Sequence, residues 1–202
     1  MDAPPAPAPK VASRWEDFID IFYAPSDVYA RRANSGFGIP MLVVAVLLGV
    51  IGLANFNAMQ PIMDAEFTRS TAAIMKQNPK VTVEMMEKGR AMGETFGKIG
   101  GFIFAPIAIF CVGLILWVVG KFVDAKQTLT AAIMVAAYAY VPRIAEQVLN
   151  GVQGLLMDPA SLNGRLRLSL GVGRFLDPDT TSPMLLAIIG RLDVFTIWVT
   201  VL

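Results

Sequence analysis

Two long stretches of the chain contain no ionisable residue, and they restrict the possible folds more than any other feature. They are residues 39–56 and 99–120, which read IPMLVVAVLLGVIGLANF and IGGFIFAPIAIFCVGLILWVVG. A helix needs roughly 20 apolar residues to cross about 30 Å of hydrocarbon. The chain is 55% hydrophobic and 16% charged, whereas soluble domains carry about 25% charged residues. Burial inside a soluble protein is the weaker alternative, and the sequence predicts an all-α, polytopic transmembrane helix bundle.

Two further apolar stretches complete the expected bundle. We predict four spans and an extramembrane helical connection at residues 57–98. The spans are expected near residues 36–56, 99–120, 129–150 and 183–202. The last stretch stays apolar up to Leu202, without the polar cap that a helix end in lipid needs. We therefore expect the natural polypeptide to continue beyond this residue.

Two regions precede the first span. Residues 1–12 are rich in proline and alanine and are expected to form a disordered tail. Residues 13–35 are expected to form an amphipathic interfacial segment that begins with a capping box at Ser13 and Glu16. This segment either lies in the lipid headgroup zone or docks beneath the bundle. Its apolar face has helical spacing and consists of Trp15, Phe18, Ile19 and Phe22.

Four ionisable residues interrupt the third and fourth spans. They are Arg143 and Glu146 in AYAYVPRIAEQVLNG, and Arg191 and Asp193 in LLAIIGRLDVFTIW. The first two share one face of a helix with the polar residues around them. We expect that this face does not contact lipid, because a charge at mid-bilayer costs at least about 2.5–3.5 kcal/mol. In antiparallel spans Arg143 and Asp193 lie at similar depth, so we expect them to form an ion pair.

Two roles fit this intramembrane charge network. It is either a structural clasp that fixes the register of two helices or a pathway for a solute or a proton. The clasp is favoured, because opposite charges balance and the first two spans supply no charged side chains for a pathway. Arg191 points away from Asp193 on a helical wheel and is expected to extend toward the membrane surface.

The chain lacks the residues of most catalytic and metal sites. It has no histidine and a single cysteine, Cys111, and no nucleophile–base pair or metal-ligand spacing is found. The net charge of +1 gives no reason to expect nucleic acid as a partner. The methionines of residues 57–98 fit adaptable packing or a partner surface better than a copper(I) site. We expect no enzymatic activity and no cofactor.

Local patterns predict several smaller features. Gly97 and Gly101 are small residues four apart, a spacing that permits two helices to approach closely. Pro106 predicts a kink in the second span. The alternation in RLRLSL, residues 165–170, predicts a short extended segment. The glycines of GVG, residues 171–173, indicate only a turn.

The basic residues near the spans predict the orientation. Arg31 and Arg32 precede the first span, and Lys121 and Lys126 lie in the short link between the second and third spans. Basic residues next to spans favour the cytoplasmic side. We therefore expect a cytoplasmic N-terminus.

Three stretches, in their order along the chain, carry a family resemblance. EDFIDIFYAPSDVYARR, AYAYVPRIAEQV and RLDVFTIW together resemble the Yip family of multispanning membrane proteins, in its bacterial branch. The resemblance implies five transmembrane helices, a cytoplasmic N-terminus and no catalytic motif, so a chain with four spans looks C-terminally truncated. Eukaryotic relatives are associated with Rab-dependent vesicle traffic and membrane shaping. Bacterial relatives often accompany ABC exporters with periplasmic adaptor subunits.

The expected function is that of a non-enzymatic accessory or scaffold subunit of a membrane assembly, with an ABC-type exporter as the expected assembly. The alternative is a small transporter or channel that uses the charges of the third and fourth spans. The expected partners are the lipid bilayer and other membrane protein subunits, and self-association is left open. The expected location is the bacterial cytoplasmic (inner) membrane.

Overall fold

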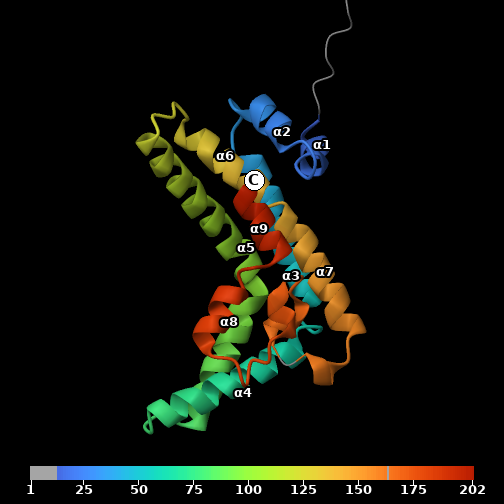
Figure 1. Cartoon of the computed structure of the whole chain (residues 1–202), viewed down its shortest axis with the longest axis vertical. Coiled ribbons are helices and arrows are strands. Elements are labelled where there is room, and N and C mark those ends of the chain that lie inside the picture. Colours follow the sequence, from blue (N-terminus) through green and yellow to red (C-terminus); the bar gives the residue numbers. More distant parts are fainter. Residues whose placement is uncertain (1–12, 163) are drawn as a thin grey trace, which may run out of the picture.

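The computed structural model describes residues 13–162 and 164–202, and this part of the chain is helical with no β-strand (Figure 1). The expected tail at residues 1–12 lies outside the described residues. The α-helices are α1 (Arg14–Asp20), α2 (Pro25–Arg32), α3 (Gly38–Asn55), α4 (Gln60–Gln77), α5 (Val83–Phe122), α6 (Leu129–Ala139), α7 (Pro142–Leu156), α8 (Pro183–Ile189) and α9 (Val194–Val201). Three short 3₁₀ helices lie between α7 and α8: η1 (Pro159–Ser161), η2 (Arg165–Leu168) and η3 (Val172–Phe175).

Helices α3, α5 and α6 form the centre of the bundle, and glycines allow them to approach closely. A Cβ atom on Gly101 of α5 would lie 2.7 Å from the Cα atom of Gly49 in α3. A Cβ atom on Gly113 would lie 2.6 Å from the Cα atom of Ile133 in α6. The expected close approach is therefore confirmed at Gly101. The buried core around these crossings includes Val44, Leu48, Ile109, Ile133 and Ala137.

Two described helices, α3 and α5, are long and apolar enough to cross a membrane. The pair α8 and α9 adds a third candidate if the two are counted as one span, although they are bent by 55°. The membrane-spanning character of the chain is thus supported. With 40 residues, α5 is about 60 Å long, twice the hydrocarbon thickness of about 30 Å, and it continues on both sides of Pro106.

The third expected span consists of two helices. Helix α6 ends at Ala139, and α7 begins at Pro142 and runs to Leu156. At the junction, the N–H groups of Arg143 and Ile144 bond to carbonyls three residues earlier, as in a 3₁₀ turn. Pro142 has no N–H group to continue the α-helical pattern, so the break follows from the sequence.

The fourth expected span is also broken, between Ile189 and Val194. The segment before it packs against the break, because a Cβ atom on Gly171 would collide with the backbone carbonyl of Leu192. Gly171 therefore allows a close backbone approach and is more than the turn residue that the sequence indicates. The expected extended segment at residues 165–170 is wrong: Arg165–Leu168 is a 3₁₀ helix.

The two ends of the bundle are formed by different elements of the chain. Helices α1 and α2, the turn between α5 and α6, and the end of α9 lie together at one end (Figure 1). Helix α4 lies at the opposite end, beside the first part of α5 (Figure 1). A small second core there contains Ile62, Leu162 and Leu168.

Candidate functional site

The polar face of α7 is the first part of the candidate site. Pro142 occupies the first turn, where a missing N–H group leaves no helical bond unmade. Arg143 and Glu146 follow on one face, since residues three apart are neighbours on a helix. The Arg143 Nη1 atom donates to the Glu146 Oε2 atom at 2.5 Å, and the two side chains are 30% and 22% exposed. This ion pair is therefore still accessible from outside the protein.

Asp193 is the N-cap of α9 and does not form the expected ion pair with Arg143. Its Oδ1 atom accepts from the Phe195 N–H group at 2.9 Å. Its Oδ2 atom accepts from the Ser169 hydroxyl and from the Leu170 N–H group, both at 2.7 Å. The break before α9 creates N–H groups that lack helical partners, and an aspartate cap satisfies them. The expectation of an Arg143–Asp193 pair is wrong for this reason.

Arg143 reaches α9 at another position. Its Nη2 atom donates to the Thr196 hydroxyl at 3.3 Å. Glu146, Asp193 and Thr196 line one cavity. Arg191 lies exposed in the break between α8 and α9, and within residues 13–162 and 164–202 it has no ion pair. The structure thus brings three of the four predicted residues into one region and leaves Arg191 outside it.

Two adjoining cavities lie beside this polar face, with volumes of about 540 and 760 Å³. We call them together the α5–α7 chamber. Binding sites for small ligands have volumes of roughly 300–1,000 Å³, so each cavity has a suitable size. The residues that line both cavities are Gly97, Glu146, Gln147, Asn150 and Arg165.

The wall that α5 contributes to the chamber is formed largely by glycines. A Cβ atom on Gly97 would meet only the Phe56 ring, at 3.9 Å, and a Cβ atom on Gly93 would meet nothing within 4 Å. Both glycines line the larger cavity. The chamber therefore exists in part because α5 has no side chains at these positions.

An amide contact fixes α7 beside α3. The Asn55 Nδ2 atom donates to the backbone carbonyl of Gln147 at 2.7 Å. The Asn55 side chain occupies the space that a Cβ atom on Gly151 would need. Gly151 therefore allows α3 and α7 to approach closely beside the chamber.

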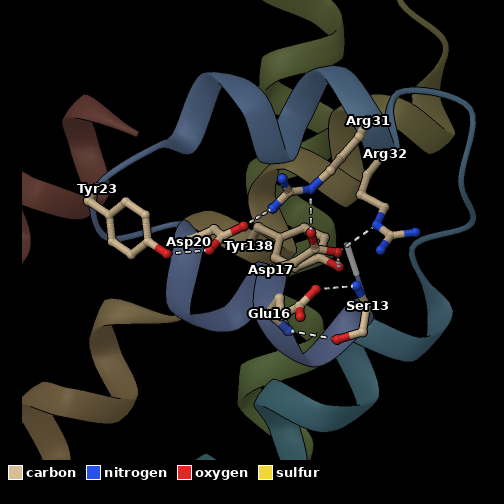
Figure 2. A network of polar contacts seen from close by, with 8 residues as sticks. All are labelled: Ser13, Glu16, Asp17, Asp20, Tyr23, Arg31, Arg32 and Tyr138. Carbon is tan, nitrogen blue, oxygen red and sulfur yellow. Dashed lines mark hydrogen bonds and ion pairs between the residues drawn. The ribbon is translucent and has the colours of Figure 1, made fainter. Parts of the chain in front are cut away.

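A second polar cluster holds the N-terminal helices against α6 (Figure 2). The Asp17 side chain is fully buried. It accepts from the Nε atoms of Arg31 at 2.7 Å and of Arg32 at 2.5 Å, and from the Tyr138 hydroxyl of α6 at 3.3 Å. The expected capping box is confirmed, because Ser13 and Glu16 exchange hydrogen bonds at the start of α1.

Neighbouring groups extend this N-terminal cluster. The Tyr23 hydroxyl donates to Asp20 at 2.5 Å, and Arg31 also binds Asp20. These two contacts hold the pKa of Asp20 below its usual range, with the Tyr23 bond as the larger cause. Aromatic packing also joins the cluster to the bundle, since the ring centroids of Phe18 and Tyr138 lie 5.5 Å apart.

The sequence gives no direct indication of the Asp17 cluster. The helical spacing of residues 13–22 puts the acidic residues away from the apolar face, and this position favours their exposure to solvent. The pair Arg31–Arg32 predicts only the orientation of the chain in the membrane. Two adjacent arginines at the end of α2 and a tyrosine in an apolar span are the sequence features that could have indicated a buried carboxylate, because such a group needs charged and hydrogen-bonding partners.

Comparison with known proteins gives one match. The family model described as Yip1 domain matches residues 19–202. No curated protein matches the chain, and no solved structure matches it. The matched region begins inside α1 and includes both the N-terminal cluster residues Asp20, Arg31 and Tyr138 and the chamber.

Proposed function

Because the chain belongs to the Yip1 domain family, we propose that it is a non-enzymatic accessory or scaffold subunit of a membrane protein assembly. The supporting observation is the first part of α5, residues 83–98, which extends beyond the apolar stretch at 99–120. Its Met85, Met92 and Phe96 side chains are 58%, 61% and 52% exposed. Exposed apolar groups outside a membrane mark sites for partners, and methionine adapts well to varied partner surfaces.

The base of this projecting segment is held in place. Arg90 of α5 binds Glu94 at 2.9 Å and also pairs with Asp64 of α4. Its guanidinium lies 5.1 Å from the centre of the Phe67 ring. These contacts position α4 beside α5 and leave the methionine side of α5 uncovered, which suits a docking role.

The proposed assembly is an ABC-type exporter, and the resemblance to bacterial Yip proteins supports this choice. The full chain, purified gently from native membranes, should co-purify with the transporter subunit and its periplasmic adaptor. Replacing Met85 and Met92 together by glutamine should reduce recovery of these subunits several-fold, whereas Glu87→Gln on the same segment should not. Recovery of no exporter subunit would reject the exporter assignment, and equal recovery with both variants would reject the methionine surface.

The proposed topology has four spans in the bacterial cytoplasmic membrane, with the N-terminus in the cytoplasm. The spans are α3, α5, the pair α6–α7 and the pair α8–α9. In support, Arg31 and Arg32 lie at the same end of the bundle as the α5–α6 turn with Lys121 and Lys126 (Figure 1). Basic residues at one end favour its cytoplasmic placement.

A second candidate function, a small transporter or channel, is favoured by one observation. The α5–α7 chamber places the Arg143–Glu146 ion pair and Asp193 beside open space within the bundle. Solute flux into proteoliposomes that is lost with Arg143→Ala would favour this function. Flux that is absent from the wild-type protein would exclude it for the solutes tested.

A further inference from the structure

The α5–α7 chamber presents charged groups at a depth where only hydrocarbon is expected. From Leu129 to Arg143 the chain rises about 20 Å at 1.5 Å per residue, within a hydrocarbon layer of about 30 Å. The Arg143 and Glu146 side chains are 30% and 22% exposed there. Charged groups inside a membrane face a polar or aqueous partner. An accessible ion pair at this depth therefore requires a polar group in the chamber.

The rim of the chamber faces the lipid. Phe104 of α5, which belongs to the apolar stretch at residues 99–120, lines the larger cavity and is 59% exposed. An apolar residue that is both at the rim and on the outer surface provides a route for acyl chains along α5. The opposite wall, formed by α7, is polar. A molecule with one polar end and one apolar end matches these two walls.

The charges on the polar wall determine which polar headgroup fits the chamber. In the described part of the chain, Arg143 uses Nη1 and Nη2 for Glu146 and Thr196, and Glu146 uses Oε2 for Arg143. The Arg143 Nε and Glu146 Oε1 atoms have no protein partner among the described residues. A phosphate suits the guanidinium, and an ammonium suits the carboxylate. A zwitterionic group offers both and leaves the net charge of the site unchanged.

We propose that the α5–α7 chamber binds a phospholipid with a zwitterionic headgroup. The phosphate contacts Arg143, the ammonium contacts Glu146, and the acyl chains lie along α5 past Phe104. The lipid comes from the leaflet at the α4 end of the bundle, because Arg165, which lines both cavities, pairs with Glu66 of α4. This inference goes beyond the accessory role and does not depend on it.

The first test fills the chamber from the α5 side. A leucine at Gly97 projects into the chamber, since a Cβ atom there meets only the Phe56 ring at 3.9 Å. The matched control is Gly89→Leu, because Gly89 lies on the same helix, has nothing within 4 Å of its Cβ position and does not line the chamber. The delipidated full chain is titrated in detergent with phosphatidylethanolamine, and binding is read by native mass spectrometry.

We expect the wild-type protein and Gly89→Leu to retain one phosphatidylethanolamine molecule, and Gly97→Leu to bind it at least tenfold more weakly. If Gly97→Leu does not fold, Gly93→Leu replaces it, because Gly93 lines the chamber and also has open space around its Cβ position. Unchanged binding in the folded chamber variant overturns the proposal.

The second test changes the charge of the site. Glu146→Gln preserves the size of the side chain and leaves Arg143 as the uncompensated charge. We expect this variant to shift the preference from phosphatidylethanolamine toward anionic phosphatidylglycerol by about tenfold, or 1.4 kcal/mol. An unchanged preference would show that the headgroup does not contact Glu146, and it would overturn the proposal. Both tests are independent of exporter co-purification, so failure of one proposal leaves the other intact.

Discussion

Asp17 is the residue on which the attachment of the N-terminal helices depends. Its carboxylate is fully buried and accepts from Arg31, Arg32 and Tyr138. A buried charge is tolerated only when it is paired and hydrogen-bonded, and here the partners come from α2 and from α6. One carboxylate therefore joins three helices.

Replacing Asp17 by asparagine should detach α1 and α2 from the bundle. Arg31 and Arg32 then both lose the charged carboxylate that they share, and breaking a buried ion pair in this way costs about 3–5 kcal/mol. Limited trypsin digestion of the detergent-solubilised protein should cleave after Arg31 or Arg32 much faster than in the wild type. The control is Asp27→Asn, an exposed residue of α2, which should leave cleavage unchanged. Equal protection in both variants would contradict the role of Asp17.

The contribution of Asp20 should depend on pH. The Tyr23 hydroxyl, and then Arg31, hold the pKa of Asp20 below its usual range. A lowered pKa in the folded state stabilises the protein above the ordinary aspartate pKa of about 3.9, and this stabilisation is lost as the pH falls through the lowered value. The melting temperature should therefore differ between the wild type and Asp20→Asn at pH 7, and the difference should shrink below about pH 4. A difference that stays constant over this range would contradict the expectation.

At the residue scale, the sequence predicted a polar group of residues but not all of their partners. Arg143 and Glu146 were placed on one face of a helix, as the structure has them. The pairing with Asp193 failed because helical continuity was assumed, whereas the break before Val194 turns Asp193 into a helix cap. Spacing reveals which side chains share a helix face, but it does not reveal where a helix stops.

The elements of the bundle are positioned by glycines whose roles differ along one helix. Gly101 of α5 lies against the backbone of α3, while Gly89 of the same helix has open space around it. Gly93 and Gly97, between them, border the chamber. A single row of small residues thus serves first as a free surface, then as a cavity wall, then as a helix contact.

Gly101→Ala should destabilise the bundle, and Gly89→Ala should not. The new methyl group at Gly101 would lie 2.7 Å from the Gly49 Cα atom, and overpacking of this kind typically costs about 1–3 kcal/mol. At Gly89 no steric clash offsets the gain in helix propensity, so the alanine should stabilise the protein by roughly 1 kcal/mol. Thermal unfolding of both variants in detergent provides the comparison. A loss of stability in both would show that α5 needs flexibility rather than close packing.

At the element scale, long apolar helices were the most predictable feature and their interruptions the least. Helices α3 and α5 follow from uncharged stretches of sufficient length. The break before Pro142 could have been predicted from the sequence, because proline interrupts the helical hydrogen-bond pattern. The break between α8 and α9 is accompanied by the close approach of Gly171 to Leu192, a tertiary contact that no local pattern encodes.

The whole molecule has a helix about 60 Å long in α5, so one end of the protein must project from the bilayer. Cysteine labelling tests which end this is, in a background where Cys111 is replaced by serine. A cysteine at Glu87 should react with a membrane-impermeant reagent from the periplasmic side. Cysteines at Asp27 and Asp124 should react only after the membrane is opened. Labelling of Glu87 and Asp124 positions from the same side would contradict the proposed topology.

At the scale of the whole chain, composition predicted the class of protein and the family resemblance was confirmed by the Yip1 domain match over residues 19–202. The docking of α1 and α2 on the bundle was one of two alternatives that the sequence left open. This docking is supported by a contact between Asp17 and Tyr138, which are separated by 121 positions. Contacts of such separation depend on the assembled bundle.

The ring of Trp198 in α9 meets the ring of Phe22 edge-on, with centroids 5.3 Å apart. These residues come from the first and last described stretches of the chain. During synthesis, Phe22 leaves the ribosome long before Trp198, so this contact forms only after α9 has been inserted. A nascent chain arrested before residue 198 would present an N-terminal segment that still lacks this contact and is open to chaperones or proteases.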